Sequence, residues 1–186
     1  MIEDIPKRVF LDTASLNFIL EYGEEIFDGM PFSEELNDRI REDMDAFHNI
    51  FLVGQRATWE LAISPFTYKE IIKTNDAKKK HYLESWFMNV WDYWLSIIKT
   101  NNNLPFFMEG EDAKIKFLSS GILDILPDIE DKVLLSDAIV YRCDYFCTRD
   151  WQTILKYRDQ LETLPVKIIT PSEWWCLIRP FAALWV

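Results

Sequence analysis

The residues most able to do chemistry in this chain are acids that follow short hydrophobic runs. Asp12 closes the run 8–11, and Asp150 comes just after the run 145–148. Asp137 lies upstream of the second run, on a segment whose apolar spacing predicts a helix. Carboxylates gathered in one place can bind Mg²⁺ or Mn²⁺, because oxygen ligands suit hard cations. Such a cation polarises a phosphoryl oxygen and lowers the pKa of bound water, which is the chemistry of phosphodiester hydrolysis.

Sheet topology gives a reason for two of these acids to meet. Residues 8–13 and 145–148 both have the length and composition of core strands. In an open parallel sheet, ligands bind outside the carboxyl ends of the strands, where the strand order reverses. If the two strands are neighbours across that reversal, Asp12 and Asp150 face one crevice. The alternative is that each aspartate simply favours the turn that follows its strand.

Glu70 is a further candidate on the same rim. Residues 58–64 predict a second strand, and Pro65 fits its end, since proline cannot join a central ladder. Thr67 is then placed to cap a short helix over residues 68–73 that carries Glu70. The alternative is an exposed glutamate on a lysine-rich helix surface.

The remaining sequence predicts strands alternating with helices, which is typical of a parallel sheet covered on both faces. Residues 170–173 match a capping box with proline at the first helical position. We expect strands at residues 8–13, 58–64, 122–126, 145–148 and 166–169. We expect helices at residues 12–27 (weakened at Gly23), from Ser33 to about 51, 68–73, 77–99, 111–120, around Asp137, at 151–161 and through Arg179.

Composition indicates one globular domain, residues 1–186. Hydrophobic residues make up 49% of the chain and charged residues 27%, which is typical of a folded protein with a substantial core. No run of about 18 uncharged apolar residues predicts a membrane span, and the first ten residues lack a secretory signal. Three sparse cysteines suit a reducing cytosol, so we expect a cytoplasmic protein in which Cys143 and Cys147 are core thiols.

Net charge counts against a general nucleic-acid binder. The chain carries a charge of −11, whereas proteins that bind nucleic acid gain affinity when Lys and Arg release counterions from phosphates. Metal ions held by clustered acids would restore positive charge locally.

The sequence also lacks the glycine-rich phosphate loops and the nucleophile elbow of other enzyme classes. A haloacid dehalogenase would need a second Asp at position 14, where Ala14 stands.

Four segments resemble the PIN domain, a family of small metal-dependent ribonucleases that includes VapC-type toxins. The matching segments, in the family's order, are VFLDT at the start, SPFTYKEI at 64–71, SDAIVYRCDYFCTRD at 136–150 and VKIITPSEW at 166–174. The chain departs from the family at Ala14, where a small polar residue is common. It also departs at residues 78–120, which form a longer and more aromatic helical insert than is usual.

The resemblance implies a fold, a site and an activity. The fold is a three-layer α/β PIN-like domain with a central parallel sheet of about five strands. The site comprises Asp12, Glu70, Asp137 and Asp150 as acids around Mg²⁺ or Mn²⁺, with Thr148 as a supporting hydroxyl. The activity is endonucleolytic cleavage of RNA, in the role of the toxin of a toxin–antitoxin pair. The alternative is a catalytically inactive PIN-like module that acts through protein interactions.

Partners follow from charge and aromatic content. An acidic protein cannot grip a long duplex backbone, so we expect single-stranded or looped RNA to enter past Arg149, Lys69 and Lys73. Eight tryptophans in one small domain predict an interface with an antitoxin protein or a second copy of the chain, because aromatic residues are enriched in interface cores. The insert at residues 78–107 and the tail near Trp174, Trp175 and Trp185 are the expected contact regions.

Overall fold

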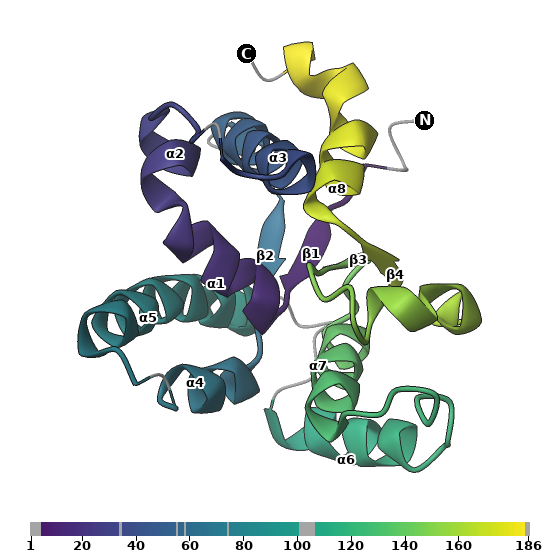
Figure 1. The fold of residues 1–186 in the computed structure, drawn as a ribbon. Helices are drawn as coiled ribbons and strands as arrows, with labels where there is room; N and C mark the ends of the chain where they lie inside the picture. Colours follow the sequence, from purple (N-terminus) through teal and green to yellow (C-terminus); the bar gives the residue numbers. More distant parts are fainter. Residues whose placement is uncertain are drawn as a thin grey trace.

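A four-stranded parallel sheet with the order β2-β1-β3-β4 forms the centre of the protein (Figure 1). The computed structural model describes residues 5–184 apart from residues 34, 55, 58, 74 and 101–106, and at residues 78, 79, 107–110 and 184 it describes the backbone alone. The strands are β1 (Arg8–Leu11), β2 (Glu60–Ala62), β3 (Tyr145–Cys147) and β4 (Lys167–Ile169).

Helices connect and cover these strands. They are α1 (Thr13–Glu21), α2 (Gly23–Asp28), α3 (Asp38–Gly54), α4 (Pro65–Ile71), α5 (Ala77–Thr100), α6 (Phe107–Leu118), α7 (Ile129–Val140) and α8 (Pro171–Ile178), with 3₁₀-helices η2 (Leu155–Leu161) and η3 (Arg179–Leu184). Within the described residues, no helix combines the length and the apolar character needed to cross a bilayer.

The strand order reverses between β1 and β3. The chain steps from β1 to β2 on one side, and it later returns to place β3 on the other side. Val9 of β1 therefore lies opposite both Leu61 and Tyr145 in the parallel register. This confirms the expectation that the first strand and the strand at 145–148 are neighbours across the reversal.

Side chains that alternate along the strands bury two separate cores, one on each face of the sheet. Val9 and Leu11 join a core with α1, α3 and α8. Phe10 points to the other face, where it stacks on Phe146 at 5.2 Å between ring centroids and packs with α7. Helices therefore cover both faces, as the alternating sequence pattern predicts.

The long helix α5 contributes to both cores. Its first half buries Leu83 and Phe87 on one face of the sheet, and its second half buries Trp94 and Ile98 on the other. Figure 1 shows α5 alongside β2, the strand at this edge of the sheet. Part of the apolar surface of α5 is thus used inside the protein.

The prediction of a strand at residues 122–126, the third of the five expected along the chain, is wrong. This segment forms consecutive turns, with Asp124 N–H donating to Gly121 O at 3.1 Å and Leu126 N–H to Leu123 O at 3.0 Å. Leu123 and Leu126 are buried, three residues apart. A strand would bury alternate residues, so the period of three decides against it.

Several helix limits also differ from the expected ones. The helix expected at 12–27 is two helices, which meet at Tyr22 rather than bending at Gly23. The helix expected from Ser33 begins at Asp38, where Asn37 Oδ1 accepts from the backbone of Ile40 at 3.0 Å. Residues 151–154 are turns, and the 3₁₀-helix η2 follows them. The capping box that joins Thr170 and Glu173 is confirmed at the start of α8.

Candidate active site

Asp12 lies at the carboxyl end of β1 and caps α1. Its Oδ1 atom accepts a hydrogen bond from the backbone of Ser15 at 2.7 Å, and its Oδ2 atom accepts one from the hydroxyl of Thr148. The side chain is nearly inaccessible, since only 2% of the residue is exposed. Burial raises the pKa of Asp12 to about 7, although the hydrogen bonds from Thr148 and Ser15 oppose that rise.

Asp150 follows β3, and its backbone is linked to Asp12 through Thr148. The hydroxyl of Thr148, which donates to Asp12, also accepts from the backbone N–H of Asp150 at 2.9 Å. Asp150 is itself held by the backbone N–H groups of Gln152 and Thr153, each 2.9 Å from Oδ1. The negative charge of Asp150 adds to the rise in the pKa of Asp12, although burial is the main cause of that rise.

Glu70 approaches from α4. The hydroxyl of Thr13, the residue after Asp12, donates to Glu70 Oε2. Burial raises the pKa of Glu70, and the nearby Glu130 of α7 raises it further. The helix that carries Glu70 is capped by Ser64, not by Thr67 as expected, and Thr67 is buried within α4.

Asp137 is buried on α7 and is engaged at both of its oxygens. Ser64 Oγ donates to Oδ2 at 2.5 Å, and Lys114 Nζ of α6 lies 2.6 Å from Oδ1. Burial raises the pKa of Asp137, whereas Lys114 and then Ser64 lower it. Lys114 carried no signal in the sequence, because it meets Asp137 only through the packing of α6 on α7.

Hydroxyl groups at the ends of three adjacent strands bind three of the four predicted acids. Ser64 follows β2, Thr13 follows β1 and Thr148 follows β3, and each of these hydroxyls binds one of the acids. The carboxyl ends of β2, β1 and β3 therefore share one rim, as expected for the point of strand reversal.

Comparison with known proteins identifies no relative. No family model, curated protein or solved structure matches this chain. The resemblance to the PIN domain therefore rests on the four sequence segments and stays a prediction.

A second acid interacts with Asp150. Asp131 of α7 is a further acid here that the sequence did not single out, because acids in the first turn of a helix usually serve its dipole. Burial raises its pKa to about 6, the hydroxyl of Thr153 opposes the rise, and Asp150 adds to it. Its Oδ2 atom is buried without a hydrogen-bond partner. Such an atom is often satisfied by an ion or a water molecule.

The arrangement at Asp137 does not fit a cation as it stands, because Lys114 already supplies a positive charge there. Within the described part of the chain, no three His, Cys, Asp or Glu side chains converge closely enough to hold a metal ion. The acids are therefore brought to one rim without being gathered into a complete set of ligands.

Arg149, which we expected at the entrance to the site, instead forms an ion pair with Asp43. Its Nε atom donates to Asp43 Oδ2 at 2.8 Å, and its guanidinium lies 3.4 Å from the centre of the Phe18 ring. Asp43 is 1% exposed and also accepts from Ser172 at 2.8 Å. A buried carboxylate needs a cationic partner, so Arg149 anchors the loop before Asp150 to α3 and α8.

The expected interface residues are divided between core and surface. Trp174 is fully buried and Trp175 is half-buried, whereas Trp185 lies outside the described residues. On α5, Tyr82 and Met88 remain exposed. The basic cluster expected at residues 78–80 is described only in part. Cys143 and Cys147 are buried free thiols, which confirms that they belong to the core.

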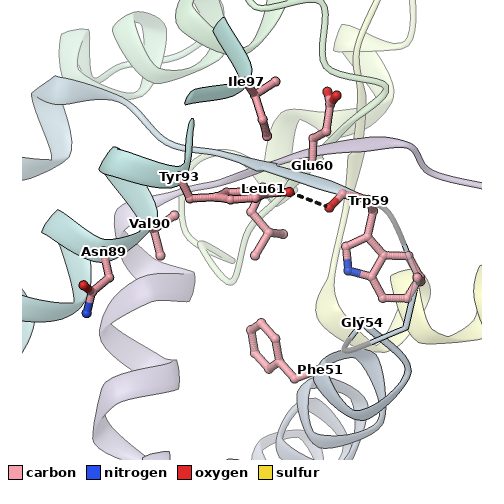
Figure 2. Close-up of a pocket in the computed structure, with 10 residues that line it drawn as sticks. Phe51, Gly54, Trp59, Glu60, Leu61, Asn89, Val90, Tyr93 and Ile97 are labelled. Carbon is pink, nitrogen blue, oxygen red and sulfur yellow. Dashed lines mark hydrogen bonds between the residues drawn. The ribbon is translucent and has the colours of Figure 1, made fainter. Parts of the chain in front are cut away.

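A cavity of about 650 Å³ lies away from these acids, between the end of α3, β2 and α5 (Figure 2). Apolar side chains such as Phe51 and Val90 line it. Tyr93 crosses its margin, and its hydroxyl donates to the carbonyl of Trp59 at 3.2 Å. Because β2 is an edge strand, this hydrogen bond occupies an edge carbonyl that another chain could otherwise pair with. None of the predicted site residues lines this cavity.

Proposed function

We propose that this protein is a metal-dependent endoribonuclease with a PIN-like fold. The observation that supports the proposal most is the hydroxyl of Thr148, which binds Asp12 and the backbone of Asp150 at the ends of neighbouring strands. A buried carboxylate such as Asp12, with a second acid nearby, favours binding a proton or a cation that neutralises it. The raised pKa of Asp12, about 7, is consistent with that demand.

Each acid has a separate role in the proposal. Asp12 and Asp150 bind Mg²⁺ or Mn²⁺ directly, and the unpartnered oxygen of Asp131 adds a donor near Asp150. The bound cation would supply a water of lowered pKa and would neutralise the phosphate. Thr148 is a positioning residue, because it fixes Asp12 and Asp150 relative to each other. Glu70 and Asp137 complete the site from α4 and α7.

RNA that is single-stranded or looped is the proposed substrate. A net charge of −11 leaves few cations for phosphate contacts. Lys73 is committed to Glu130 at 3.1 Å, and Arg149 is committed to Asp43. Trp151, directly after Asp150, is 43% exposed, with the Arg39 guanidinium 4.0 Å from its ring centre. Exposed aromatic rings stack on unpaired bases, so Trp151 favours an unstacked strand over a duplex.

A cleavage assay tests the activity. The protein is incubated with Mn²⁺ and labelled hairpin RNA, duplex RNA or single-stranded DNA, alongside Asp12→Asn and an EDTA control. Cleavage confined to the hairpin loop, and lost both in the variant and in EDTA, is expected. Absence of cleavage on every RNA would contradict the proposal. Recovery of a small partner protein with the chain would support the role of a toxin bound by its antitoxin.

The second candidate function is a catalytically inactive module that binds other proteins. The ion pair between Lys114 and Asp137 favours this second function, because the ammonium of Lys114 neutralises Asp137 without a metal ion. Melting curves separate the two functions. A nuclease should melt at a higher temperature in millimolar Mn²⁺ than in EDTA, because a ligand that binds only the folded state stabilises it. An inactive module need show no difference.

A further inference from the structure

Lys114 gives the candidate site a positive charge that belongs to the protein itself. It extends from α6, its side chain is 14% exposed, and its Nζ atom lies 2.6 Å from Oδ1 of Asp137. Ser64 engages Oδ2 of the same carboxylate at 2.5 Å. Each oxygen of Asp137 therefore already has a partner. The partner of Oδ1 is an ammonium, which carries a full positive charge.

Stability alone is a weak explanation for this pair. Removing an ammonium and a carboxylate from water costs free energy, and the attraction between them often does no more than offset that cost. Apolar residues of similar size at the same positions often give a protein that is equally stable. Lys114 also has Glu111 of its own helix within 4.0 Å, so α6 could satisfy the ammonium without Asp137. The pair instead connects α6 to one of the four acids of the rim.

We propose that the ammonium of Lys114 occupies the cation position at Asp137, so that Lys114 and a divalent cation compete for this carboxylate. The inference rests on the proposed function and adds regulation to it. With α6 in place, the site is closed at Asp137 and incomplete as a metal centre. Without the ammonium, the buried carboxylate of Asp137 would keep only the hydroxyl of Ser64, which leaves a negative charge that a divalent cation would neutralise.

Substitution of Lys114 tests the competition directly. Lys114→Met keeps an unbranched side chain only one atom shorter and removes its charge. Lys116→Met is the matched control, because Lys116 lies exposed on the same helix. Binding of Mn²⁺ is measured by calorimetry and by the Mn²⁺-dependent rise in melting temperature, with no RNA present. We expect the Kd of Lys114→Met to be about tenfold lower than that of the unmodified protein, because a neighbouring like charge shifts an ionic equilibrium by at least that much. Lys116→Met should bind as the unmodified protein does.

The double variant Lys114→Met/Asp137→Asn shows whether the gain arises at Asp137. Loss of the tighter binding in this variant supports the inference. Equal Kd values for the unmodified protein, Lys114→Met and Lys116→Met would overturn the inference and leave the proposed function standing. Absence of Mn²⁺ binding in every variant would overturn both. If Lys114→Met is unfolded without metal, refolding in millimolar Mn²⁺ supports the competition, and failure to refold counts against it.

Discussion

The hydroxyl of Thr148 donates a hydrogen bond to the buried carboxylate of Asp12, across the junction between β3 and β1. The same oxygen accepts the backbone N–H of Asp150 at 2.9 Å. One side chain therefore determines where two acids lie relative to each other. The link is local in space but joins residues 136 positions apart in the chain.

Thr148→Val should lower both stability and activity. Valine keeps the shape of threonine but removes the hydroxyl that donates to Oδ2 of Asp12. A buried group that loses its partner costs about 1–3 kcal/mol of unfolding free energy. Urea unfolding measures the loss, and the cleavage rate in Mn²⁺ should fall as well. Thr163→Val, at an exposed position, is the control that should leave both quantities unchanged.

Asp137→Asn should destabilise the protein. Carboxylate repulsion by itself would predict a neutral or stabilising effect, but Lys114 lies 2.6 Å from this carboxylate and would lose its partner. We expect a loss of about 2 kcal/mol, less than for a fully enclosed pair, because Lys114 can turn to Glu111 or to water. RNA cleavage should also be lost. Full activity in a folded Asp137→Asn protein would remove Asp137 from the proposed site.

Stability should decrease as pH rises from about 4 to about 7. The pKa of Asp12 is raised to about 7 in the folded protein, above its ordinary value of 3.8, so in this range the folded state binds a proton that the unfolded state has released. The protonated form is favoured by folding at low pH, and this contribution is lost as pH rises through the folded pKa. Asp131, with a pKa raised to about 6, acts in the same direction.

Asp12→Asn provides the check on this pH dependence. The variant should show a shallower fall in unfolding free energy between pH 4 and pH 7, measured by urea unfolding at each pH in EDTA. Mn²⁺ should stabilise the unmodified protein more at pH 8 than at pH 5, because the cation and the proton compete for the same carboxylates. An identical pH profile in the variant would show that Asp12 is not the group responsible.

Trp151→Ala should weaken RNA binding without removing the cleavage chemistry. Stacking of one base on an aromatic ring contributes about 1–3 kcal/mol, so KM should rise by about tenfold to a hundredfold while kcat changes little. Trp151→Phe should recover part of the affinity. Tyr82→Ala removes a more exposed ring, on α5, and is the control. A normal KM in Trp151→Ala would exclude stacking at this position.

Short-range patterns in the sequence determined the strands and several of the helix ends. Alternation of apolar residues, proline after a strand and the Thr170–Glu173 capping box all act within a few residues, so they operate before any tertiary contact forms. The same local signals put Asp12 and Asp150 at strand ends. Parallel topology then allowed the two acids to be predicted as neighbours, and the strand order agrees.

Tertiary packing decided what those acids contact. Residues 122–126 have the composition of a strand, yet only turns allow Leu123 and Leu126 to be buried together. Arg149 is 106 positions from Asp43 and Lys114 belongs to a different helix from Asp137, so no local pattern relates either pair. Burial of a carboxylate creates a strong demand for a cation, and which cation meets it depends on which helix folds against the site.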